Sequence, residues 1–170
     1  MKGKAAIRDA ALFVALFLLV SVPAYFVLGL FAEPFAAVAA YSSEVMLNAA
    51  GGNASVAFEA GVAHLASASF DAEIGDLCWG RVELAVLAGI IMASWDRTLR
   101  RRIWGVILGI AVLLVLNPIR IAASLAAFNP QNPQASALLH DFFFRITLVV
   151  VLVTYYAVWY YWLSKKGNKK

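Results

Sequence analysis

Residues 96–128 read DRTLRRRIWGVILGIAVLLVLNPIRIAASLAAF, a basic loop followed by two apolar runs that meet at Asn117-Pro118. The apolar part, 103–128, is longer than the roughly 20 residues that a helix needs to cross the hydrocarbon core of a bilayer. Asn117 is a typical N-cap residue and Pro118 suits the first turn of a helix, so we expect the span to break at 117–118. The segment therefore predicts an integral membrane protein.

The composition of the whole chain supports that prediction. Of its 170 residues, 63% are hydrophobic and only 14% are charged, and the mean hydropathy is +0.80. A soluble domain carries roughly 45–50% apolar and about 25% charged residues. A chain with so few charges cannot cover a water-facing surface, which excludes an ordinary soluble domain, and its length allows a single integral membrane domain, residues 1–170.

Three further apolar runs, at 10–31, 80–95 and 142–162, raise the number of expected spans to about four. A cleaved signal peptide has flanks similar to those of the run at 10–31. That run is long, however, and no small-x-small cleavage site follows it, so we expect it to remain as a span. The expected fold class is an all-α, polytopic transmembrane helix bundle.

The outer loop, 33–79, separates the first two spans. Its segment 35–47 is mildly amphipathic and too short to span easily, so we expect it to lie along the outer interface. Its segment 51–76 is polar and contains an alternating stretch at 67–74. Alternation with a period of two is typical of strands, so the loop is compatible with a short β-hairpin.

The positions of the basic residues predict the orientation. Eleven of the 14 Lys and Arg residues lie in the N-terminal tail, the 96–102 loop and the C-terminal tail. The positive-inside rule places these segments, and with them both termini, in the cytoplasm. The net charge of +4 is thereby explained by membrane orientation, and no nucleic-acid partner is expected.

The other three basic residues, Arg81, Arg120 and Arg145, each lie near the outer end of a predicted span. Ionisable residues within membrane segments are costly and usually face the interior of the bundle or a water-filled cavity. Cys78, the only cysteine, and His140 lie at the same expected depth. Three separate segments therefore bring Cys78, Arg120 and His140 to one side of the membrane, as an active site requires.

Each of these residues also has a structural interpretation. A lone cysteine in an apolar chain is usually a small buried hydrophobic residue, and His140 could cap a helix or reach the interface. Cys78 is expected to open a helix, however, where the helix dipole favours a thiolate. The arginines could instead form structural ion pairs with the nearby acidic residues Asp76, Glu83 and Asp141.

Several enzyme classes are excluded by their missing motifs. The chain has no Cys-x-x-Cys pair, no Gly-x-Ser-x-Gly elbow and no His-Glu-x-x-His sequence. One cysteine and two histidines do not make a convincing zinc site. The remaining chemistry is nucleophilic catalysis by a cysteine with a nearby base and a cationic stabiliser, and it needs no metal or cofactor.

At these residues the chain resembles the exosortase/archaeosortase membrane transpeptidases. The resemblance rests on Cys78-Trp79-Gly80, on Asn117-Pro118-Ile119-Arg120, and on a segment that contains both His140 and Arg145. It covers about residues 75–163. The chain departs from the family in having Trp79 where a small residue is expected, and in having fewer spans than many members.

The resemblance implies a two-step acyl transfer with Cys78 as nucleophile, Arg120 as stabiliser of the thiolate or oxyanion, and His140 as base. Arg145 is the second candidate for the third position, because exosortases have His there and archaeosortases have Arg. The implied substrates are secreted proteins with a C-terminal motif, a hydrophobic span and a basic tail. The implied acceptor is an amine on a membrane lipid.

Two other classes of function compete with this hypothesis. A non-enzymatic membrane scaffold or assembly subunit would use the outer polar cluster as a structural ion-pair network, with Cys78 inert. A transporter would use the arginines to bind an anion, but four spans without a visible inverted repeat disfavour it.

Overall fold

The computed structural model describes residues 2–76, 78–129 and 131–163; within them, the side chains of 2–5, 133, 137, 139, 140, 143, 147, 148, 162 and 163 lie outside the description. The helices are α1 (Lys2–Gly29), α2 (Ala32–Ala49), α3 (Arg81–Ala93), α4 (Leu99–Ala126) and α5 (Pro133–Val158), and α5 ends in one turn of π-helix, η1 (Trp159–Leu163). The strands are β1 (Ser55–Glu59), β2 (Val62–Ala66) and β3 (Asp71–Glu73).

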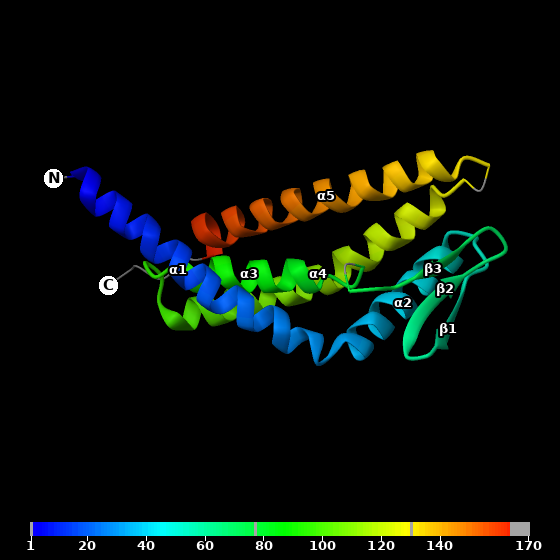
Figure 1. Cartoon of the computed structure of the whole chain (residues 1–170), viewed down its shortest axis with the longest axis horizontal. Coiled ribbons are helices and arrows are strands. Elements are labelled where there is room, and N and C mark those ends of the chain that lie inside the picture. The colour runs from blue at the N-terminus through cyan, green and yellow to red at the C-terminus, as the bar shows by residue number, and fades with distance from the viewer. Residues whose placement is uncertain (1, 77, 130, 164–170) are drawn as a thin grey trace.

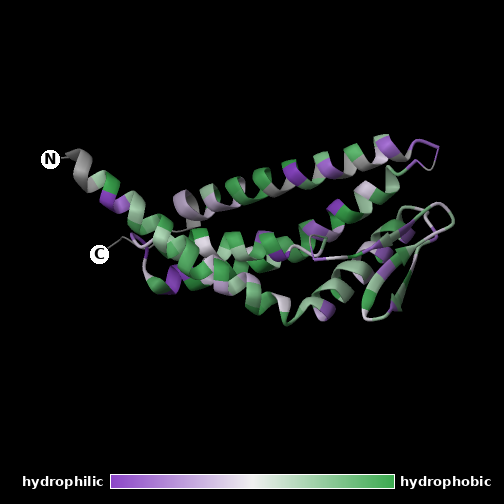
Figure 2. Cartoon of the chain, in the orientation of Figure 1, coloured by the Kyte–Doolittle hydropathy of each residue, from purple (hydrophilic) through white to green (hydrophobic). Residues whose placement is uncertain are grey.

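Three of the helices in the described chain are long and apolar enough to cross a membrane, over Ala6–Gly29, Leu99–Ala126 and Phe144–Tyr161. Only 6% of the residues in the most apolar window of α1 are buried in the molecule, and Figure 2 shows hydrophobic residues covering most of this helix. Such a surface needs a lipid cover rather than water. The expectation of a helical membrane protein is confirmed.

The predicted span at 80–95 is not among these three candidates. It corresponds to α3, whose 13 residues extend over about 20 Å, whereas the hydrocarbon core is about 30 Å thick. α3 packs against α1, α4 and α5, and Leu87 and Ile91 are fully buried there. Four spans are therefore not established, although α3 leads the chain back from the sheet to the loop before α4 (Figure 1).

The predicted break at 117–118 is wrong. Asn117 and Pro118 lie inside α4, which continues as one helix from Leu99 to Ala126. Proline removes one backbone donor from a helix, and α4 nevertheless continues through it, with the side chain of Pro118 fully buried and its carbonyl oxygen accepting from the Ser43 hydroxyl of α2 at 3.3 Å. Asn117 does not act as a cap, because its side chain donates to the carbonyl oxygen of Cys78.

The segment predicted as an outer loop, 33–79, contains more regular structure than the sequence predicts. α2 occupies its first part, and β1, β2 and β3 form a three-stranded antiparallel sheet in which β2 is central. β1 and β2 form a hairpin that pairs from Ser55–Ala66 to Glu59–Val62. This hairpin precedes the alternating stretch at 67–74, in which only β3 is a strand. The sheet packs against α2 at one end of the molecule (Figure 1).

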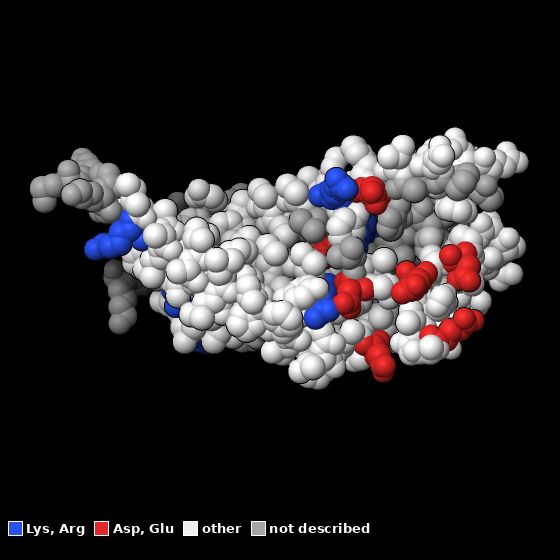
Figure 3. All heavy atoms as spheres, in the orientation of Figure 1, with Lys and Arg blue, Asp and Glu red and all other residues white. Residues whose placement is uncertain are grey.

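The long helices run side by side along the molecule, with the sheet at one end (Figure 1). The start of α1, the connection between α3 and α4, and the end of α5 lie at the opposite end. Acidic side chains gather over the end that carries the sheet (Figure 3), where the exposed ones are Glu33, Glu59, Asp71, Glu73 and Asp76.

Candidate active site

Cys78 lies in the turn that joins the sheet to α3. Its backbone N–H donates to the carbonyl oxygen of Gly75 at 2.8 Å. Gly80 follows in the left-handed region, with a φ of 92°, and α3 begins at Arg81. Cys78 therefore precedes the helix instead of opening it, because the chain must first turn at Gly80, a conformation that glycine adopts without steric cost.

The thiol of Cys78 is half-buried, and burial raises its pKa above the ordinary value. A backbone hydrogen bond at Gly75 and the positive charge of Arg120 oppose this shift, and the carboxylates of Glu73 and Glu83 add to it. The sequence predicted a thiolate favoured by the helix dipole. In the structure, desolvation is the largest influence on the pKa of this thiol and favours its neutral form, so a nearby base would assist a reaction at Cys78.

Arg120 is buried at the centre of the site and contacts three elements. Its Nη1 donates to Glu83 Oε1 of α3 at 2.8 Å, and its Nη2 donates to the carbonyl oxygen of Cys78 at 3.1 Å. Its guanidinium carbon lies 4.7 Å from the centre of the Phe144 ring of α5. The relative exposed areas of the Arg120 and Glu83 side chains are 7% and 3%, so this ion pair is shielded from water.

Asn117 and Arg120 act on the same atom. They are three residues apart on one face of α4, and both side chains donate to the carbonyl oxygen of Cys78. α4 thereby holds the backbone of Cys78 from across the bundle. The sequence motif identified both residues, but the role of Asn117 was missed because an Asn-Pro pair is also a typical helix start.

The two candidates for the third position differ in their surroundings. The guanidinium of Arg145 lies 3.8 Å from the carboxylate of Asp141, one turn earlier in α5, and the exposed fractions of the two side chains are 79% and 66%. His140 belongs to α5, but its side chain lies outside the described residues. The structure therefore brings Cys78 and Arg120 together, and it does not bring Arg145 to them.

All three arginines form the ion pairs that a structural interpretation requires, although the Arg145–Asp141 pair is exposed. Arg120 pairs with Glu83, and Arg81 pairs with Asp76 and also lies over the ring of Tyr25 at 3.9 Å. Glu83 could be found from the sequence, because it is the one acidic residue within the apolar run 80–95.

A cavity of about 350 Å³ borders Cys78. Its walls are mostly apolar, and come from Ile121, Leu125 and Phe128 at the end of α4 and in the following turn. The carboxylates of Glu73 and Asp141 also line it. A second hollow, also of about 350 Å³, shares Leu125 and Phe128 with the first and extends over residues 50–54 and 67–70. The thiol therefore borders an elongated, largely apolar surface.

No group of three or more His, Cys, Asp and Glu residues that could hold a metal ion occurs among the described residues. The arrangement provides a nucleophile whose backbone is fixed by a buried cation, next to a space for an extended chain. Acyl transfer at a thiol is the chemistry that these groups support.

Residues 1–157 match the family model described as Transmembrane exosortase (Exosortase_EpsH). The match confirms the resemblance drawn from the cysteine, the Asn-x-x-Arg sequence and the His/Arg segment, and it extends to the N-terminal helix. No curated protein and no solved structure matches the chain significantly.

Proposed function

Because this chain belongs to the transmembrane exosortase family, we propose that it is a membrane cysteine transpeptidase that processes secreted proteins. Its substrates carry a C-terminal sorting motif, a hydrophobic span and a basic tail. The observation that carries the proposal is the junction of Cys78 and Arg120, two residues 42 positions apart, beside an open cavity.

The reaction begins when the Cys78 sulfur attacks the carbonyl carbon of a peptide bond near the sorting motif. The thiol proton passes to His140, and the tetrahedral intermediate collapses to a thioester as the C–N bond breaks. His140 returns the proton to the leaving amine. The raised pKa of Cys78 supports this step, because a thiol that is neutral at rest needs a base to react.

The second step releases the protein onto its acceptor. An acceptor amine, on a membrane lipid, attacks the thioester carbon, a new C–N bond forms and the C–S bond breaks. The proton lost by the amine restores the Cys78 thiol through His140. The position of the reacting thiol next to transmembrane helices supports a lipid acceptor, since lipid headgroups lie at the ends of such helices.

Arg120 stabilises negative charge in both steps. Its guanidinium lies against the peptide group of Cys78, so positive charge is present beside the nucleophile before substrate binds. Preorganised charge of this kind stabilises a developing oxyanion without reorganisation during the reaction. Glu83 and Asn117 are positioning residues, because they hold Arg120 and Cys78 in register.

We assign the base to His140 and keep Arg145 as the second candidate. The exposure of Arg145 and its contact with Asp141 support this choice. An arginine is also always protonated at accessible pH and cannot accept the thiol proton.

The competing function is a scaffold in which these groups are structural. The buried Arg120–Glu83 pair and the Arg81–Asp76 pair favour it. The two functions differ in their need for the thiol. Among the described residues, the hydrogen bonding of the Cys78 sulfur consists of one long contact of 3.9 Å with the Glu73 carbonyl oxygen.

The test is co-expression of the full chain with a secreted reporter that carries a tripartite C-terminal tail from a protein encoded beside it. We expect Cys78→Ala and Arg120→Ala to abolish the loss of the tail, measured as a mass shift of the reporter. For Arg120 the expected loss corresponds to about 3–4 kcal/mol, or roughly 10²–10³-fold in rate. Arg8→Ala, which changes an exposed arginine in α1, serves as the matched control.

Each variant must also be present in the membrane at the wild-type level. Full processing by a membrane-inserted Cys78→Ala protein would reject the enzyme and favour the scaffold. A thioester-linked reporter, released by hydroxylamine and absent from Cys78→Ala, would identify the covalent intermediate directly.

A further inference from the structure

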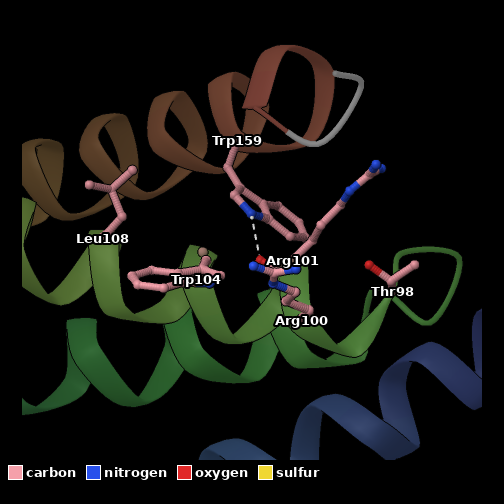
Figure 4. Close-up of a pocket in the computed structure, with 7 residues that line it drawn as sticks. Thr98, Arg100, Arg101, Trp104, Leu108 and Trp159 are labelled. Atoms are coloured by element: carbon pink, nitrogen blue, oxygen red, sulfur yellow. Dashed lines mark hydrogen bonds between the residues drawn. The ribbon is translucent and has the colours of Figure 1, made fainter. Parts of the chain in front are cut away.

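A separate cavity, which is neither of the two hollows beside Cys78, lies at the end of the molecule opposite the sheet, where α4 begins. Its volume is about 550 Å³, and Figure 4 shows it between the first turns of α4 and Trp159, which follows α5. It is lined by Arg100, Arg101, Trp104, Leu108 and Trp159, with Thr98 and Gly105. None of these residues belongs to the site around Cys78.

The cavity changes from charged to apolar along α4. Arg100, Trp104 and Leu108 follow one another at intervals of four residues, and Arg101 and Gly105 have the same interval on the neighbouring line of the helix. The two guanidinium groups therefore lie at the end of the candidate span Leu99–Ala126. The indole of Trp104 and the side chain of Leu108 lie further into it, with 61% and 45% of their area exposed.

The wall opposite α4 is held close by specific contacts. Trp159 donates its indole N–H to the carbonyl oxygen of Arg101 at 3.4 Å, and Tyr155 donates its hydroxyl to the carbonyl oxygen of Gly105 at 2.6 Å. A side chain at Gly105 would overlap the Trp159 ring. The shape of the cavity is therefore built into the packing of α4 against α5.

Neighbouring arginines have partners within the protein. Arg102 donates to the carbonyl oxygen of Met92 at 2.7 Å, and Arg97 lies over the ring of Tyr160 at 4.1 Å and 3.4 Å from Asp96. Arg100 and Arg101 line the cavity. Within the described residues, no carboxylate is part of its lining, so its charge is positive and favours an anion.

We propose that this cavity binds an anionic phospholipid, with the phosphate at Arg100 and Arg101 and the start of an acyl chain along Trp104 and Leu108. A phospholipid has the same order of charge and apolar surface, and it is present where a membrane span ends. Basic pockets between transmembrane helices recognise such headgroups, and arginine binds phosphate oxygens in a fork. A free phosphate ion would use the arginine end alone.

The test uses the purified full chain in mild detergent and measures retained lipid by native mass spectrometry. Phosphatidylglycerol and phosphatidylcholine of the same acyl length are compared, and inorganic phosphate is added as the soluble anion. We expect phosphatidylglycerol to be retained more than phosphatidylcholine, and Arg100→Gln to weaken its binding roughly fivefold. Arg8→Gln, an exposed arginine outside the cavity, should have no effect.

Two further variants complete the test: one conserves the charge of the cavity, and the other changes its apolar lining. Arg101→Lys keeps the positive charge and should retain most of the binding, and Trp104→Ala should weaken both lipids without removing the preference for the anionic one. Equal retention of the two lipids by the wild type, or unchanged binding by Arg100→Gln, would overturn the proposal. Displacement of phosphatidylglycerol by millimolar phosphate would also overturn it, because the site would then be one for a soluble anion.

Discussion

Glu83 carries a buried charge that pairs with the Arg120 guanidinium, and its second oxygen, Oε2, has no hydrogen-bond partner among the described residues. Breaking a buried ion pair by removing one partner typically costs about 3–5 kcal/mol, because the other charge stays buried and unpaired. We expect Glu83→Ala to lower the thermal unfolding temperature of the detergent-purified protein clearly. Glu59→Ala, an exposed carboxylate on β1, should leave it unchanged.

The Glu83→Gln variant distinguishes the effect of losing the negative charge from the effect of losing the whole side chain. Glutamine keeps an oxygen that can accept from Arg120, so it should recover part of the lost stability. If Glu83→Ala unfolded at the wild-type temperature, the buried pair would contribute nothing to stability, and the positioning role of Glu83 would have to be abandoned.

The second residue-scale prediction concerns the protonation of Cys78. Iodoacetamide reacts with the thiolate, so its rate against pH reports the pKa of the thiol without any substrate. Removing the positive charge in Arg120→Ala should raise that pKa further, because Arg120 opposes the effect of burial. The labelling curve should shift to higher pH, whereas Arg120→Lys, which keeps a cation, should shift it less.

The same titration distinguishes His140 from Arg145. If His140 is the base, His140→Ala should show little labelling at neutral pH and recover only above the ordinary thiol pKa of about 8.5, because burial raises the pKa of Cys78. Arg145→Ala should have a small effect, because its exposed charge is screened by solvent. An upward shift in Arg145→Ala without one in His140→Ala would exchange the two assignments.

At the scale of elements, the turn between the sheet and α3 determines where the thiol lies. Gly80 has a φ of 92°, and a Cβ added there would lie 3.2 Å from Asn117 Nδ2. Gly51 has a φ of 87° with no atom within 4 Å of such a Cβ. Gly80→Ala and Gly51→Ala should therefore carry a similar backbone strain of about 1–3 kcal/mol.

Only Gly80→Ala should reduce processing of the tripartite reporter, because only there does the new methyl group press on the side chain that holds Cys78. The comparison requires both variants at equal levels in the membrane. Equal losses of processing in the two would attribute the effect to strain alone and remove Asn117 from the positioning of the nucleophile.

Helices were predictable from the sequence where an apolar run is also long enough to cross a membrane. The runs that became α1, α4 and α5 are long and apolar, so their existence as helices follows from the cost of exposing backbone groups to lipid. Pro118 misled the prediction, since whether a proline ends a helix depends on the packing around it. Pro118 is fully buried in α4, and its contact with Ser43 of α2 joins residues 75 positions apart. Of the strands, β3 lies in the alternating stretch at 67–74, whereas β1 and β2 lie before it and were not located from the sequence.

The candidate site was predictable in part for the same reason. Charged residues in apolar runs stand out, so Arg120 and Glu83 could be picked from the sequence, and the lone cysteine with them. The hydrogen bonds from Asn117 and Arg120 to the Cys78 carbonyl depend on the register of α4 against the turn at Gly80. That register is set by tertiary packing and leaves no local pattern in the sequence.

For the whole molecule, charge and fold together predict how the chain sits in the membrane. Arg8 and the 96–102 loop lie at one end, and the exposed carboxylates of the sheet and α2 gather at the other (Figures 1 and 3). By the positive-inside rule the basic end belongs in the cytoplasm. We expect Cys78 and its cavity to face the extracytoplasmic side, where secreted substrates are found.

Single-cysteine labelling tests this orientation and also whether α3 completes a crossing. In a Cys78→Ser background, Asn53→Cys reports the sheet end and Thr98→Cys the basic end, and both positions are exposed. A membrane-impermeant maleimide should label Asn53→Cys on intact cells and Thr98→Cys only after lysis. If α3, at 13 residues, did not carry the chain across, the two positions would share one side and react alike. The reverse pattern would invert the molecule and place the thiol in the cytoplasm, away from any secreted substrate.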